Sequence, residues 1–289
     1  MSTSPFYRTA AAPFTHGLSP WNSRRLLELL PFALDELPAP KRPSGLEEML
    51  FQGSYPRLYD RPVKPQDWYP AYLQTYVERD VRQLKNVTNL ETFRRFLGLC
   101  AARTGQLLNY SSLAADAGVS HPTVMGWISL LETSFIIHLL RPHHANFSKR
   151  LIKMPKLHFI DTGLACSLLG IEKASQLVSH PLKGALFETW VVGELLKRRL
   201  NQGLRSNLFF WRDKTGHEID ALADEAGQLF PFEIKAGKTV SSDMFRDLAY
   251  WHKLAGRKAG KATLIFGGQA PVVHPEVTVL PWNDIRNSL

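Results

Sequence analysis

The sequence predicts an α/β protein in which an all-helical, winged-helix region is followed by a three-layer α/β domain with a mixed sheet. Two observations support this prediction. Apolar residues recur at helical spacing from residue 71 to residue 131, whereas the order beyond residue 180 is helix, three strands, helix and strand. Hairpin-linked strands followed by a crossover helix are typical of a mixed sheet that lies between helical layers.

Composition favours a cytoplasmic protein with a polyanionic partner. Hydrophobic residues make up 44% of the 289 residues and charged residues 21%, the balance of a soluble globular protein. No apolar run approaches the length of a membrane span, and the N-terminus lacks a signal-peptide pattern, so we expect no membrane contact. Cys100 and Cys166 have no metal-site spacing and fit reduced thiols. The net charge of +9 favours DNA as the partner.

Residues 1–70 form the first of three predicted regions and are interrupted by frequent prolines. Proline ends helices and removes ladder hydrogen bonds, so only short helices fit here, such as one over 45–51. The segment lacks the continuous periodicity of a self-sufficient domain. We therefore interpret it as a fragment, or as an arm packed on something else.

Residues 71–170 form the second region, a winged helix-turn-helix region. Ser120 is a suitable N-cap for the second helix of the turn, and Pro122 falls in the first turn of that helix, where proline is tolerated. The predicted elements are helices over 71–85 and 90–102, a helix-turn-helix over 111–131, and strands over 135–140 and 156–160 with a hairpin at 147–153.

The predicted winged helix offers few groups that could read DNA bases. The exposed positions of its second helix, about His121, Thr123, Met125 and Ser129, include no lysine or arginine. A protein-binding or interdomain role for this module therefore stays open beside DNA binding. Basic side chains that could contact DNA phosphates gather instead at the wing, at Lys149, Arg150, Lys153 and Lys156.

Residues 171–289 form the third region, and a linker over 170–180 leads into it. Pro231 conflicts with the central strand in which it falls, because proline cannot donate to a ladder. The predicted elements are a helix over 182–200, strands over 207–212, 217–223 and 229–235, a helix over 244–254, a strand over 262–266 and an edge strand over 277–280.

An acidic motif in this region carries the chemistry: Asp220 is followed by Glu233, Ile234 and Lys235. Strand alternation puts Glu233 and Lys235 on one face, about 7 Å apart at the backbone, and a hairpin brings Asp220 beside Glu233. Two carboxylates suit a divalent cation, and an amine can position an attacking water, so the motif indicates metal-dependent phosphodiester cleavage. The alternative is an ordinary surface pair of Glu233 and Lys235.

Glu188 is a further candidate because its helical neighbours are all apolar. A buried carboxylate is costly unless it is paired or binds a cation, and a metal site above the sheet would supply that partner. Glu194, by contrast, precedes Lys197 and Arg198, a pattern typical of a solvated face. The apolar neighbours of Glu188 are Ala185, Val191, Val192 and Leu195.

Two other polar residues receive structural roles. Asp161 lies between a predicted strand and a predicted helix, so either it or Thr162 is expected to cap that helix. His217 is expected on the strand face opposite Asp220 and is therefore not assigned as a base.

Several motifs together resemble the C-terminal part of a prokaryotic AAA-type ATPase family, in which a winged helix precedes a restriction-endonuclease-like, or PD-(D/E)XK, domain. The motifs in the last third are FETWVVGEL, GHEIDALAD and FPFEIKAGK. The resemblance implies Glu188, Asp220 and Glu233 as Mg²⁺ ligands, with Lys235 beside the attacked phosphate. Residues 1–70 would then be the end of an ATPase domain. The upstream motifs are RLLELLPFALDEL, FQGSYPRLYDR, YVERDVRQL and HFIDTGLACSLLG.

The phosphate-binding loop of such an ATPase is missing. The segment 236–239 reads AGKT, but the loop requires a glycine five positions before Gly237, where Phe232 stands. We therefore expect no ATP binding by this chain alone, and a separate ATPase or another protein as a partner.

Two functions follow from these features. The first is a Mg²⁺-dependent DNA endonuclease-like activity in which Asp220, Glu233 and Lys235 are catalytic. The alternative is a non-catalytic DNA- or protein-binding regulatory module of an ATPase.

Overall fold

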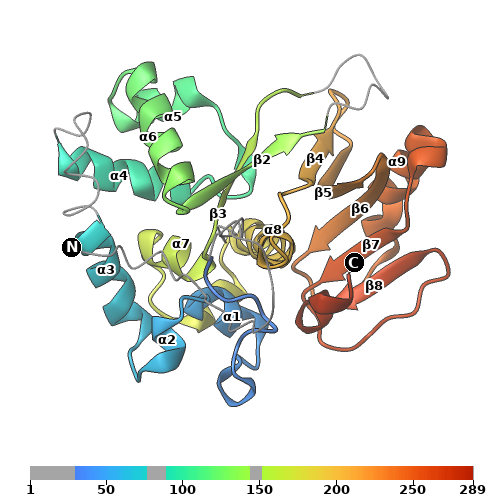
Figure 1. Ribbon diagram of the computed structural model, residues 1–289, viewed down its shortest axis with the longest axis horizontal. Helices are drawn as coiled ribbons and strands as arrows, with labels where there is room; N and C mark the ends of the chain where they lie inside the picture. Colours follow the sequence, from blue (N-terminus) through green and yellow to red (C-terminus); the bar gives the residue numbers. More distant parts are fainter. Residues whose placement is uncertain (1–29, 77–88, 144–151, 289) are drawn as a thin grey trace, which may run out of the picture.

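The computed structural model describes residues 30–76, 89–143 and 152–288. Within these residues, one eight-stranded mixed sheet has the order β1-β3-β2-β4-β5-β6-β7-β8 (Figure 1). The predicted α/β class is therefore confirmed. The strands are β1 (Gln106–Leu107), β2 (Ile137–Pro142), β3 (Lys156–Phe159), β4 (Leu208–Arg212), β5 (Glu218–Glu225), β6 (Gln228–Lys235), β7 (Ala262–Phe266) and β8 (Val277–Pro281).

Helices cover both faces of the sheet. α8 packs on one face against β3 and β6, and α9 packs on the other face against β5 and β6. No helix within the described ranges is both long and apolar enough to cross a membrane. The α-helices are α1 (Leu46–Gln52), α2 (Arg57–Asp60), α3 (Pro65–Thr75), α4 (Leu90–Ala101), α5 (Tyr110–Ala117), α6 (His121–Thr133), α7 (Thr162–Leu168), α8 (Lys183–Asn201) and α9 (Arg246–Ala255).

The helix pair α5 and α6 forms as the sequence predicts. Gly118 ends α5 in the left-handed conformation, with φ of 69°, and allows the sharp turn between the helices. Ser120 caps α6, because its Oγ accepts a hydrogen bond from the Thr123 amide at 3.2 Å. The antiparallel strands β2 and β3 follow, while most of the predicted hairpin at 147–153 lies outside the described residues.

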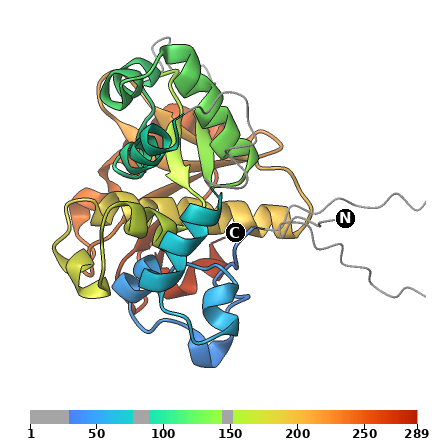
Figure 2. The same cartoon turned by 90° about the vertical axis from the view of Figure 1, so that its left-hand side faces the viewer.

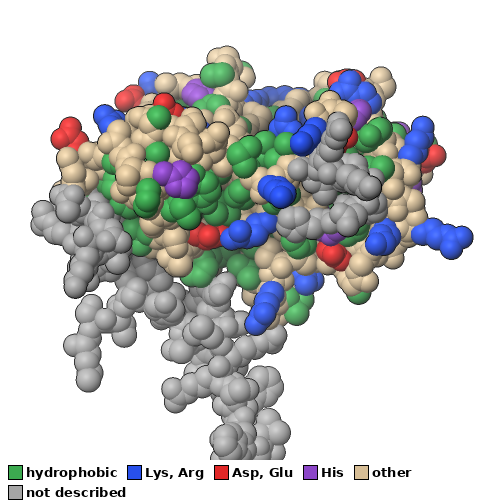
Figure 3. Space-filling model, turned by 90° about the horizontal axis from the view of Figure 1, so that it is seen from above, with side chains coloured by type: hydrophobic (Ala, Val, Ile, Leu, Met, Phe, Trp, Pro, Cys, Tyr) green, Lys and Arg blue, Asp and Glu red, His purple; other side chains and the backbone are tan. Residues whose placement is uncertain are grey.

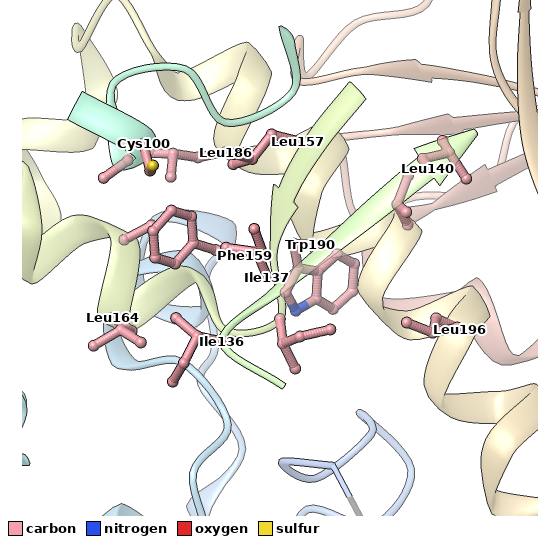
Figure 4. Packing of buried hydrophobic residues seen from close by; sticks show 14 of the residues in the cluster. Cys100, Ile136, Ile137, Leu140, Leu157, Phe159, Leu164, Leu186, Trp190 and Leu196 are labelled. Atoms are coloured by element: carbon pink, nitrogen blue, oxygen red, sulfur yellow. The ribbon is translucent and has the colours of Figure 1, made fainter. Parts of the chain in front are cut away.

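The second and third predicted regions share one sheet. β2 pairs parallel with β4 through Arg141 opposite Phe209 and Pro142 opposite Phe210. A single core also spans the junction, since Ile137 of β2 and Phe159 of β3 lie in the same cluster as Trp190 of α8 (Figure 4). The second and third regions therefore share one core, and residues 170–180 do not divide two independent cores.

Pro231 is accommodated by the local register of β6. A two-residue turn at Ala226-Gly227 closes the β5–β6 hairpin, and alternation from that turn puts Pro231 in a non-hydrogen-bonded pair with Leu222. Pairing with β7 begins only at Phe232. The missing amide hydrogen therefore falls outside both ladders.

The segment from Leu30 to Gln52 is an arm that packs on α8, on the side away from the sheet's α9 face. Figure 2 shows α8 running across the middle of the molecule, with α1 and α2 below it and α5 and α6 above it. The Leu34 amide donates to Glu194 Oε2 at 2.7 Å, and Lys197 Nζ donates to the Phe32 carbonyl at 3.0 Å. The interpretation of the first region as a packed arm is confirmed for this segment.

The prediction that Glu194 and Lys197 belong to a solvated face is wrong. Glu194 is 6% exposed and Lys197 is 2% exposed, and their charged groups are 3.0 Å apart. The spacing of three residues is the same for a buried pair and an exposed one, so the pattern alone could not reveal the arm that covers them. Lys197 Nζ also donates to Ser54 Oγ at 3.0 Å, which completes its hydrogen bonding.

Asp161, one of the two residues predicted to cap α7, is the cap, and it also binds the segment that follows the arm. Its Oδ1 accepts from the Leu164 amide at 2.9 Å and from the Tyr69 hydroxyl at 2.6 Å. Its Oδ2 accepts from the Ser54 amide at 2.6 Å. A Cβ at Gly163 would lie 2.2 Å from the Tyr69 hydroxyl oxygen, so this position requires glycine.

Lys197→Met should destabilise the protein by about 3–5 kcal/mol, because it leaves the Glu194 carboxylate buried without its cation. Lys253→Met is the matched control, since Lys253 is an exposed lysine on α9 and its replacement should change stability by less than about 0.5 kcal/mol. Urea denaturation measures both. Equal stability of the two variants would show that the buried pair is not a stabilising contact.

Candidate functional site

The candidate site lies where β5 and β6 separate. Their antiparallel pairing ends at Ala221 opposite Phe232, so Asp220 and Glu233 lie just beyond the last pair. A β-bulge in the pairing of β5 with β4 lies at the same place, because Asp220 and Ala221 together face the single residue Phe210 of β4. Bulges re-aim side chains, and this bulge turns the Asp220 carboxylate toward the end of β6.

Asp220 lies at the centre of the site. Its Oδ2 accepts a hydrogen bond from the Ile234 amide at 2.8 Å and lies 3.6 Å from Lys235 Nζ. Its Oδ1 lies 4.0 Å from Lys156 Nζ. The two oxygens of one carboxylate therefore face two different lysines.

Lys156 reaches the acids from β3. Its Nζ lies 2.7 Å from Glu188 Oε1, and it also forms an ion pair with Glu218. The residue is 3% exposed, and its Nζ lies 5.6 Å from the centre of the Phe210 ring. The prediction that Lys156 contacts DNA phosphates from a wing is wrong, because the ammonium points into the protein and is satisfied by carboxylates.

Glu233 is the most deeply buried acid of the site, at 4% exposed. One carboxylate oxygen forms an ion pair with Lys235, and the other, Oε2, has no hydrogen-bond partner among the described residues. Burial and the nearby Asp220 raise the pKa of Glu233 to about 8 although Lys235 opposes them. In the absence of a cation, this carboxyl therefore holds a proton near neutral pH.

The other charged groups respond to burial in opposite ways. Burial raises the pKa of Glu188 to about 7, although Lys156 opposes this increase. Burial alone would lower the pKa of Lys156, but Glu188, Asp220 and Glu218 more than offset it, so the pKa is raised. Both ammonium groups, Lys156 and Lys235, therefore stay charged.

The structure brings together the four residues that the sequence predicted. Glu188 connects to Asp220 through Lys156, and Asp220 connects to Glu233 through Lys235. Sequence reasoning missed Glu218, whose period-two spacing from Asp220 was an available signal. It also missed the inward role of Lys156, for which the sequence holds no local signal.

The remaining predicted residues are dispersed. Lys149 and Arg150 lie outside the described residues, and Lys153 is exposed. His217 lies on the α9 side, opposite Asp220 as predicted, where its ring stacks on Tyr250 with centroids 3.8 Å apart. Its Nδ1 lies 2.7 Å from Asp247 Oδ1.

The carboxylates of Asp220 and Glu233, which lie on either side of Lys235, suit a hard divalent cation. In the ranges that the structure describes, no group of three His, Cys, Asp or Glu residues is already arranged around a metal position. The reason is that Lys156 and Lys235 lie between the carboxylates. Asp220 and Glu233 nevertheless provide oxygen ligands of the kind that Mg²⁺ prefers, and the unpartnered Glu233 Oε2 gives a buried acceptor for it.

Two family models match the chain, and both describe domains of unknown function. The first, Domain of unknown function (DUF8612), matches residues 44–175, and the second, Domain of unknown function (DUF4143), matches residues 183–285. Lys156 lies in the first match, and the four carboxylates lie in the second. The candidate site therefore combines residues from both matched regions.

Similar full-length proteins add no described activity. Uncharacterized protein Rv2008c of Mycobacterium tuberculosis and Uncharacterized protein Mb2031c of Mycobacterium bovis are each 33% identical to the chain over 175 residues. The alignment covers 60% of this chain but 38% of each relative, so the chain spans well under half of their length. No solved structure matches the chain.

In a buffer that contains a chelator, Glu233→Gln should flatten the pH dependence of stability. The pKa of Glu233 is raised from 4.5 to about 8, so between these values the native protein binds more protons than the unfolded chain. The wild-type free energy of unfolding should therefore fall as the pH rises through this window. In the variant, the slope of the free energy of unfolding against pH should be smaller by up to about 1.4 kcal/mol per pH unit. Chemical denaturation at several pH values measures it, and parallel profiles would contradict the assignment.

Proposed function

We propose that the chain is a metal-dependent phosphodiesterase of the endonuclease type, built on a PD-(D/E)XK-like domain that follows a winged helix. The observation that carries the proposal is the convergence of Asp220, Glu233 and Lys235 where β5 and β6 separate. The spacing of these three residues along the chain predicts the same grouping.

Each residue has a role in this proposal. Asp220 and Glu233 hold the cation through their carboxylate oxygens, and the Ile234 amide orients Asp220 by its hydrogen bond. Lys235, whose side chain is 38% exposed, can approach a phosphate at the surface while it stays close to both acids. A bound Mg²⁺ would polarise the attacking water and offset the charge that develops on the phosphate oxygens.

DNA is the proposed substrate because the protein is basic and its basic groups are unevenly distributed. The net charge is +9. From above, Lys and Arg side chains are more frequent over the half that carries β4, β5 and α9 than over the half that carries α5 and α6 (Figure 3). Lys153 and Lys214 are exposed basic residues that lie along the chain next to strands of the site, three residues before β3 begins and between β4 and β5. An ATPase is the proposed protein partner, since several motifs of the chain resemble the segment that follows an AAA-type ATPase domain.

Purified protein should nick supercoiled plasmid in the presence of Mg²⁺, and Lys235→Ala should lower the rate about 100-fold or more. Lys238→Ala is the control, because the Lys238 side chain is three residues further on, 71% exposed, and outside the proposed machinery. Agarose electrophoresis over time measures both rates. Cleavage by Lys235→Ala at the wild-type rate would exclude the proposed role of Lys235.

A second candidate, a non-catalytic DNA- or protein-binding module of an ATPase, is favoured by one observation. Lys156 already neutralises Glu188 and faces one oxygen of Asp220, so these two acids need no metal ion to offset their charge. The plasmid experiment separates the two functions. A wild-type protein that shifts the plasmid in a gel but leaves it intact with Mg²⁺ would support the binding module instead.

A further inference from the structure

Asp220 divides the charged cluster into two halves. The Lys156 half contains Lys156, Glu188 and Glu218 and faces Asp220 Oδ1. The Lys235 half contains Lys235 and Glu233 and faces Asp220 Oδ2. Each half thus places one ammonium group against carboxylates.

The two ammonium groups differ in their freedom to move. The Lys235 side chain is 38% exposed, so it can exchange its carboxylates for water or for an incoming phosphate. The Lys156 side chain is 3% exposed. A charged amine that leaves carboxylates inside the protein finds no water to replace them, so the cost of its departure is high.

The backbone of Lys156 is fixed as well. Lys156 pairs with Leu107 of β1 on one side and with Leu140 of β2 on the other. Its ammonium lies over the ring of Phe210, 5.6 Å from the ring centre. Strand pairing on both sides therefore holds the backbone from which the ammonium reaches these acids.

The acids around Lys156 would otherwise suit a divalent cation. Glu188, Glu218 and Asp220 each have a carboxylate oxygen within 4.0 Å of Lys156 Nζ. Several carboxylates around one point are the ligands that Mg²⁺ and Mn²⁺ prefer. Lys156 Nζ occupies that point.

We propose that Lys156 is a built-in cation of this site, which takes the place of one divalent ion and admits a metal only to the Lys235 half. This inference rests on the proposed function, because that function requires a metal in the Lys235 half. It adds the number of ions that the site takes and the residue that sets this number. The inference also means that the upstream region contributes a residue, Lys156 of β3, to the site formed by the downstream strands.

The test counts Mn²⁺ ions bound per chain, by the loss of the electron paramagnetic resonance signal of free Mn²⁺. Wild-type protein and the control Lys153→Met, an exposed lysine three residues before Lys156, should each bind one ion. Lys156→Met should bind one ion more than the wild type, because the oxygens of Glu188, Glu218 and Asp220 that face Lys156 then have no ammonium between them, while Arg212 stays 3.1 Å from the other oxygen of Glu218. An unchanged count in Lys156→Met would overturn the inference.

A charge-balanced variant protects the test against misfolding. Lys156→Met combined with Glu218→Gln removes one charge of each sign and leaves Glu188 and Asp220 as ligands. It too should bind one ion more than the wild type, and an unchanged count in this folded variant would also overturn the inference. If the wild type binds no Mn²⁺ and Lys156→Met binds one ion, the result would support Lys156 as a built-in cation. The same result would contradict the proposed metal-dependent function.

Discussion

The ion pairs of Lys156 with the acids around it are the interaction on which the rest of the structure depends. An ammonium this deeply buried requires carboxylates at hydrogen-bonding distance, and Glu188 of α8 supplies one at 2.7 Å. The requirement fixes where β3 lies relative to α8 and β5. The parallel pairing of β2 with β4 meets this requirement, because it places β2 and its partner β3 at the edge of the downstream strands.

α8 carries the second set of buried charges as well. Glu188 faces the candidate site, whereas Glu194 and Lys197 face the arm that ends at α1. Glu188 pairs with the distant Lys156, and the Glu194–Lys197 pair takes further partners from the Leu34 amide and the Phe32 carbonyl, so neither network is complete unless the distant segment has docked. The helix therefore joins the arm, the upstream hairpin and the downstream strands into one unit. This explains why a core shared by all three segments accompanies the two charge networks.

The sequence was sufficient for the features that depend on neighbouring residues. Most of the described helices and strands, the N-cap at Ser120, and the grouping of Asp220, Glu233 and Lys235 follow from spacing along the chain, whereas β1 was not predicted and the cap of α7 was narrowed only to Asp161 or Thr162. The apolar neighbours of Glu188 on the helix indicated a buried carboxylate, and its side chain is partly buried, at 15% exposed.

The sequence was insufficient where the deciding partner is distant. Lys156 looked like one of several basic wing residues, since nothing local marks a lysine that points inward. Glu194 and Lys197 looked solvated, because only the arm from Leu30 to Gln52 buries them. The continuity of β2 with β4 was missed for the same reason, since parallel pairing across a long connection leaves no pattern in either strand.

A double-mutant cycle on Lys156→Met and Glu188→Gln is the most direct test of the central claim that these charges hold the two regions together. The free energies of unfolding of the wild type, both single variants and the double variant would be measured by urea denaturation. Because the two groups are in contact and buried, the interaction energy should exceed about 1 kcal/mol, with the double variant more stable than the sum of the single effects implies. Effects that add to within about 0.5 kcal/mol would contradict the claim.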